Sequence, residues 1–152
     1  MSKVAIVMGS AKDQPKMQAA ADTLSRFGVE YDMRVLSAHK TPDAAFALAA
    51  TAAEQGYSVI IAGAGKAAHL AGVMAAKSLL PVIGVPLSAS LQGLDALLAT
   101  VQMPTGIPVA TVAVDGSANA ALLAIAILAL QDEGLTGQLA EYREDLAQQT
   151  LG

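Results

Sequence analysis

The sequence predicts an α/β fold, a three-layer sandwich on a five-stranded parallel sheet, in a single domain over residues 1–152. Short apolar runs alternate with longer helical stretches, and no linker, charge run or internal repeat interrupts them. The strand-like runs are apolar throughout, as in parallel strands that helices cover on both faces. Right-handed crossovers then give an open sandwich, and five strands suit a flavodoxin-like order.

The strands are short apolar runs that stop at small or polar residues. The first run ends at Gly9, the second at Ser37 and the third at Gly63. A length of four to six residues favours buried strands over helices for these runs. Strands are predicted over residues 4–8, 31–36, 59–62, 81–85 and 109–114.

The helices fill the intervals, and two of them carry clear boundary signals. Pro15 opens the first helix, and Gly28 follows its end. Thr41 is expected to cap the second helix, with Pro42 as its first residue and Gly56 as its stop. Helices are predicted over residues 15–27, 42–55, 67–79, 91–100, 119–130 and 135–149.

The composition indicates that copies of the chain cover part of its surface. Hydrophobic residues make up 54% and charged residues only 14%, against a typical quarter. The mean hydropathy is +0.49, which is high for a monomer. The helix over 119–130 is apolar almost all round, so it lies under the last helix or against a neighbouring subunit. We expect the C-terminal helix, about 132–152, to pack on a neighbouring subunit.

Charge and composition exclude several classes of function. The net charge of −4 and the pI near 4.9 argue against a nucleic-acid-binding protein. The absence of cysteine excludes disulfides and thiolate metal sites, and two histidines are too few for a transition-metal site. The longest apolar run, 118–130, is too short to span a membrane. The chain starts directly with a strand and shows no secretion signal, so we expect a cytoplasmic protein.

Ligands of open parallel sheets bind at the carboxyl ends of the strands, which selects residues 9–13, 37–40, 63–69 and 86–90. His39 follows the second strand in a polar loop, where it is either an exposed histidine or a proton carrier. Lys40 beside it suits phosphate. Asp13 is either a helix cap or a ligand for sugar hydroxyls, and these roles are compatible. Local sequence favours a packed, hydrogen-bonded role for His69.

The segment Gly63–Ala68 resembles two nucleotide-binding motifs, and it fails both. A dinucleotide fingerprint belongs after the first strand, with a carboxylate at the end of the next strand, and neither condition holds here. A P-loop needs Ser or Thr after Gly65-Lys66, where Ala67 stands. What remains is a tight turn, or a cradle for an anion at a helix start. A receiver-like signalling domain is disfavoured because the third strand ends without a carboxylate.

Together these segments resemble the catalytic subunit of phosphoribosylaminoimidazole carboxylase, specifically its 5-(carboxyamino)imidazole ribonucleotide mutase group. Each piece alone is weak, but they occur in the family's order from about residue 4 to 130. The pieces are Met8-Gly9-Ser10 with Asp13, Ser37-Ala38-His39-Lys40-Thr41-Pro42, Ile61-Ala62-Gly63-Ala64-Gly65, Ala67-Ala68-His69-Leu70, Gly84-Val85-Pro86, Gly93-Leu94-Asp95, Val101-Gln102-Met103-Pro104 and Asn119-Ala120-Ala121-Leu122-Leu123-Ala124.

The resemblance implies a flavodoxin-like fold, a homo-octamer with sites between subunits, and a purine-biosynthesis reaction without metal or organic cofactor. In that reaction a carboxylate moves from an exocyclic nitrogen to ring carbon 4. The residue match implies that His39 is the proton carrier and that Ser10, Asp13 and Lys40 bind the ribose and phosphate. Gly65 and its neighbours would shape the carboxylate pocket. The implied substrate-binding residues are Ser10, Asp13, Ser37, Lys40, Ala64, Gly65 and His69.

The chain departs from the family's pattern near the site. Lys12 and Gln14 stand where the mutases usually have Ser and Trp, and Lys40 replaces an Arg. Lys66 replaces a Gly in the turn after the third strand, and Ala71 replaces a Pro. Three alternatives therefore stay open beside the mutase: direct carboxylation of aminoimidazole ribonucleotide by carbon dioxide, a paralogue for a related nucleotide, and a non-catalytic nucleotide-binding relative.

Overall fold

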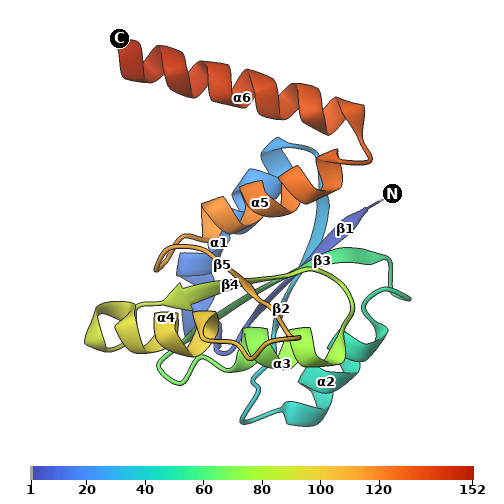
Figure 1. The fold of residues 1–152 in the computed structure, drawn as a ribbon, viewed down its shortest axis with the longest axis vertical. Coiled ribbons are helices and arrows are strands. Elements are labelled where there is room, and N and C mark those ends of the chain that lie inside the picture. Colours follow the sequence, from blue (N-terminus) through green and yellow to red (C-terminus); the bar gives the residue numbers. More distant parts are fainter. Residues whose placement is uncertain (1) are drawn as a thin grey trace.

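Five parallel strands form one sheet in the order β2-β1-β3-β4-β5 (Figure 1). This is the flavodoxin-like order, so the predicted fold class is confirmed. The structure is a computed structural model that describes residues 2–152; Met1, which the predicted domain includes, lies outside the described residues. The strands are β1 (Lys3–Met8), β2 (Glu30–Val35), β3 (Tyr57–Gly65), β4 (Val82–Leu87) and β5 (Ala110–Thr111).

Helices cover both faces of the sheet. Figure 1 shows α1 and α5 on one face and α2, α3 and α4 on the other. Single 3₁₀ turns, η1 (Ala11–Asp13) and η2 (Leu91–Gly93), precede α1 and α4. The helices are α1 (Gln14–Arg26), α2 (Pro42–Thr51), α3 (Leu70–Lys77), α4 (Leu94–Val101), α5 (Ser117–Ala129) and α6 (Glu133–Leu151). None of the helices within residues 2–152 is both long and apolar enough to cross a lipid bilayer.

The sheet separates two buried cores, because successive residues of a strand face opposite sides. Val4 and Ile6 of β1 pack with α1 and α5, while Ala5 and Val7 pack with α2 and α3. All four side chains are at most 2% exposed. This two-sided burial explains why the inner strands are mainly apolar, whereas the edge strand β2 carries Asp32 and Arg34.

The last two helices differ in how much of their surface is covered. In α5, Ala120, Ala124 and Ile125 are fully buried against the sheet and α1. In α6 only Leu135 is buried, and Figure 1 shows this helix extending beyond the rest of the chain. Tyr142, in the middle of α6, packs against Phe27 at the end of α1, with ring centroids 5.7 Å apart. The polar pattern of α6 and its exposure therefore agree.

Several boundaries differ from the sequence prediction; α3, for example, begins at Leu70 and not at residue 67. β3 continues through Gly65 instead of ending at Ala62, because Gly63 still pairs with β1 and Gly65 with β4. A side chain at Gly63 would lie 2.5 Å from the Met17 sulfur of α1. The glycine there allows close helix packing and does not mark a loop. α2 ends at Thr51, four residues early, and β5 contains only two residues. Thr41 is the N-cap residue of α2 and Pro42 its first residue, as predicted, but the Thr41 hydroxyl makes no cap bond to the helix.

Candidate active site

A cavity of about 670 Å³ lies at the carboxyl ends of β1 to β4. Loops from four strands contribute to it, and two cross-links bring them together: the Gly9 amide donates to the Gly63 carbonyl, and the Leu36 amide to the Met8 carbonyl. All eight site residues predicted from the sequence line this one cavity. They are Ser10, Asp13, Ser37, His39, Lys40, Ala64, Gly65 and His69. Their roles toward a ligand stay predictions.

The two histidines of the chain contact each other in this cavity. His39 Nε2 and His69 Nδ1 are 2.8 Å apart, and the rings meet edge to face at 87°. This distance fits a hydrogen bond in which one ring donates and the other accepts, as their tautomers dictate. His69 is exposed and precedes α3, so the expected hydrogen bond is present but the expected packing is wrong. Such a pair can hold and pass a proton to a ligand.

Hydrogen bonds within the loop after β2 fix the position of His39. The Ser37 hydroxyl accepts from the Lys40 amide at 3.0 Å. The Thr41 hydroxyl accepts from the Ser37 amide at 2.9 Å and donates to the Ser37 carbonyl. These bonds close the loop on itself, so the imidazole of His39 stands out from a fixed backbone. The hydroxyl of Thr41, the N-cap residue of α2, therefore closes this loop and does not bond to the helix.

The loop after β1 presents a carboxylate to the cavity. The Ser10 hydroxyl accepts from the Lys12 amide at 3.2 Å and caps η1. Asp13 stands directly before α1, but its side chain makes no cap bond. Burial raises the pKa of the Asp13 carboxyl, although backbone hydrogen bonding from Ser10 and the charge of Lys16 oppose this. Asp13 therefore occupies the N-cap position of α1 as expected, but without a side-chain cap bond, so its oxygens are available to a ligand.

A second polar cluster at the cavity edge was missed by the sequence analysis. Lys16 of α1 donates to the carbonyl and hydroxyl of Ser88, which follows β4. The amide and hydroxyl of Ser88 both donate to Asp115, which lies beyond β5. Burial tends to raise the pKa of Asp115, but the Ser88 hydrogen bonds and the Lys16 charge outweigh it and lower the pKa. The strand-end rule would have selected Asp115 had it been applied to the fifth strand.

The cavity concentrates positive charge in an acidic chain. Four of the nine Lys and Arg residues line it, against one of the thirteen Asp and Glu residues, Asp13. The lysines are Lys12, Lys16, Lys40 and Lys66. Such a surface favours anionic ligands. Another cavity, of about 470 Å³, lies between Phe27, Leu128 and Leu135, and neither histidine nor lysine lines it. Residues 2–152 contain no group of three or more potential metal ligands.

Comparisons with known proteins agree over nearly the whole chain. A model of the AIR carboxylase family matches residues 3–149. The chain is 56% identical over 147 residues to the N5-carboxyaminoimidazole ribonucleotide mutase of Pyrococcus abyssi, covering 96% of this chain and 84% of that protein. It is 52% identical over 153 residues to the Escherichia coli K12 protein of that name, covering 99% and 90%. The crystal structure of Treponema denticola PurE superposes with a TM-score of 0.88 at 31% identity, covering 99% of this chain and 95% of that chain.

Proposed function

The chain belongs to the AIR carboxylase family, and from that premise we propose that it is a mutase of purine biosynthesis. It converts 5-(carboxyamino)imidazole ribonucleotide into 4-carboxy-5-aminoimidazole ribonucleotide, which makes it an isomerase. The observation that carries this proposal is the His39–His69 pair in the same cavity as Ser10 and Asp13. The mutase is favoured over direct carboxylation because relatives about half identical over nearly the full chain bear the mutase name.

We assign the ribose and phosphate to the loop after β1 and to Lys40. The Asp13 carboxylate accepts hydrogen bonds from ribose hydroxyls, while Ser10 and Lys40 donate to the phosphate. The lining of the cavity by all three residues supports this assignment. Binding of the remote phosphate orients the base, so part of the entropic cost of reaction is met before chemistry starts.

The reaction needs one proton carrier and a space that retains carbon dioxide. The carbamate N–C bond breaks, carbon dioxide leaves, and the nitrogen takes a proton. Carbon 4 then attacks carbon dioxide and loses its hydrogen as a proton. Because one proton is taken up and one is released, we assign both transfers to His39, held by His69. The small apolar residues Ala64, Ala67 and Ala89 line the cavity and suit a neutral carbon dioxide molecule.

Separate supply of the two nucleotides tests the function. We expect the purified protein to form 4-carboxy-5-aminoimidazole ribonucleotide from 5-(carboxyamino)imidazole ribonucleotide without added bicarbonate. His39→Asn should lower kcat by about 10²–10⁴-fold, the usual contribution of a general acid–base. Product formed only from aminoimidazole ribonucleotide plus bicarbonate would establish the direct carboxylase. Nucleotide binding without turnover of either substrate would indicate a non-catalytic relative.

We further propose that the chain acts in the cytoplasm as a homo-octamer in which α6 packs on a neighbouring subunit. Apolar side chains on α4 and α6 support an assembly, because they face outward in the single chain. Leu94 and Leu98 of α4 are exposed, as are Leu146 and Leu151 of α6. The half of α6 beyond its Tyr142 contact with Phe27 is the part left for a neighbour.

A further inference from the structure

Lys66 has a backbone conformation that residues other than glycine rarely adopt. It follows β3 directly and has a φ of 55°, in the left-handed region that favours glycine. Its carbonyl accepts from the Ala68 amide at 2.9 Å, and the Ala67 carbonyl accepts from the His69 amide, also at 2.9 Å. The turn thus holds Lys66 in this conformation. Non-glycine residues in such conformations cluster at ligand sites, which suggests that the Lys66 side chain has a function in ligand binding.

The Lys66 side chain lines the cavity and makes no strong bond to the protein. Among residues 2–152, its ammonium group forms no ion pair within 4.0 Å, whereas Lys16 is held by Ser88. Its charge is among the smaller influences that lower the pKa of Asp95, after the hydrogen bond from Ser90. Lys66 thus lines the cavity with an ammonium group that no carboxylate of residues 2–152 pairs within 4.0 Å, so the charge is available to a ligand anion.

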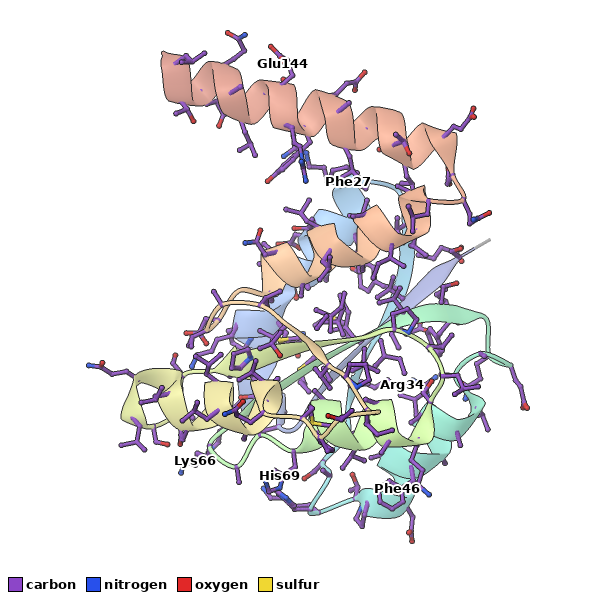
Figure 2. The ribbon with its side chains drawn as sticks, in the orientation of Figure 1. Phe27, Arg34, Phe46, Lys66, His69 and Glu144 are labelled. Carbon is purple, nitrogen blue, oxygen red and sulfur yellow. The ribbon has the colours of Figure 1, made fainter. Side chains whose placement is uncertain are left out.

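The position of Lys66 indicates which anionic group of the substrate it binds. Figure 2 shows Lys66 and His69 on the same side of the chain, at the end remote from Glu144 of α6. The two residues belong to one short loop, and the His69 ring contacts His39. The substrate carries two anionic groups: a phosphate, and a carboxylate on the base where protons are transferred. The phosphate is assigned to Ser10 and Lys40, so Lys66, which follows Gly65 and lines the same cavity as the imidazole pair, is left for the carboxylate.

We propose that Lys66 binds the migrating carboxylate and makes this site prefer carboxylated nucleotides over aminoimidazole ribonucleotide. The proposal rests on the mutase function and names a specificity residue within that site. Lys66 contacts the carboxylate on nitrogen in the substrate and on carbon 4 in the product. It gains nothing from neutral carbon dioxide between these states. Lys66 therefore contributes to binding of substrate and product and not to the transition state, so its loss raises KM without lowering kcat.

Binding measurements without turnover isolate this effect. In a His39→Asn background, titration calorimetry gives the Kd of 4-carboxy-5-aminoimidazole ribonucleotide and of aminoimidazole ribonucleotide, with and without Lys66→Met. We expect Lys66→Met to raise the Kd of the carboxylated nucleotide about 10-fold, which is the effect of losing one hydrogen bond to a charged group. The affinity for aminoimidazole ribonucleotide should change less than about 2-fold. The proposal is overturned if Lys66→Met raises both Kd values equally, or if it raises neither.

Two matched variants separate the carboxylate contact from general charge and from folding. Lys12→Met removes another cation of the same cavity, from the loop after β1, and should leave the ratio of the two Kd values unchanged. Lys66→Gly removes the cation and also the left-handed strain, so its Tm should not fall while the preference is lost. A ratio that moves with Lys12→Met as much as with Lys66→Met contradicts the proposal. Failure of the wild type to turn over 5-(carboxyamino)imidazole ribonucleotide would instead defeat the mutase function.

Discussion

Asp32 joins three strands at the end of the sheet opposite the cavity. Its carboxylate accepts a hydrogen bond from the Tyr57 hydroxyl of β3 and forms an ion pair with Lys3 of β1 at 3.1 Å. The Lys3 ammonium also lies over the Tyr57 ring, 4.3 Å from its centroid. The hydrogen bond from Tyr57, followed by that from Lys3, lowers the pKa of Asp32. The ionised carboxylate therefore stabilises the starts of these strands.

The lowered pKa of Asp32 predicts how stability depends on pH. A carboxylate with a depressed pKa stabilises the fold above its unfolded pKa of about 3.9, and this is lost as pH falls through the folded value. Asp32→Asn should lower Tm by about 2–4 °C at pH 7, since the side chain is 44% exposed and the loss is near 1 kcal/mol. As pH falls below about 4 toward the lowered pKa of Asp32, the two melting curves should approach each other, because the Asp32 carboxyl is progressively protonated and becomes neutral like Asn. A constant difference between pH 7 and pH 3 would contradict this.

Single residues were predictable where one local rule was enough. Strand-end position and residue type selected His39, Lys40 and Ser10, and these residues line the cavity. The contact between His39 and His69 was not predictable from local sequence, because their loops are 30 residues apart and meet only through the β2-β1-β3 order. The N-cap position of Thr41 was predicted correctly, but its hydroxyl makes no cap bond because it bonds to the Ser37 backbone.

At the scale of elements, glycines in strands and helices have opposite effects on stability. Gly84 of β4 faces the layer of α3 and α4, where a methyl group would lie 2.3 Å from Thr100 and 3.0 Å from Val109. Gly137 of α6 has nothing within 4 Å of that position. The first glycine allows two layers to approach closely, while the second only weakens an exposed helix.

Alanine at these two glycines tests this difference. Gly84→Ala should destabilise the protein by about 1–3 kcal/mol through overpacking, and Gly137→Ala should stabilise it by about 0.5–1 kcal/mol through helix propensity. The measurement is Tm by calorimetry at one protein concentration, with each variant serving as the other's control. If both alanines shift Tm in the same direction, the contact geometry assigned to β4 is wrong.

The elements themselves were predictable to a large extent. Every predicted strand and helix exists, because apolar runs and helical stretches differ in length and period. The boundaries were wrong where tertiary packing overrides a local signal. Gly63 looks like a loop residue, but it continues β3 by pairing with both neighbouring strands, and it lets Met17 pack closely against the sheet. β5, at the sheet edge, pairs only through Ala110 and Thr111, although the apolar run is longer.

The whole molecule carries an assembly prediction. With α6 on a neighbouring subunit, the wild type should have eight times the chain mass of 15.3 kDa by light scattering. Leu146 and Leu151 are 45% and 84% exposed in the single chain. The double variant Leu146→Glu, Leu151→Glu should form smaller species, because two charges would be buried at the interface. Gln148→Glu adds a charge to the same stretch without removing a leucine and should assemble. A monomeric wild type, or an unchanged mass for the double variant, would contradict the prediction.

The lysine-lined cavity affects how a nucleotide reaches an acidic protein. With a formal net charge of −4, the chain as a whole repels an anion, while the lysines that line the cavity attract it to the cavity opening. Diffusional encounters are then guided to that opening instead of being spread over the surface. Dissolved ions limit this guidance to about 8 Å at physiological ionic strength. Added salt therefore slows capture of the nucleotide, while carboxylate transfer inside the cavity proceeds at the same rate.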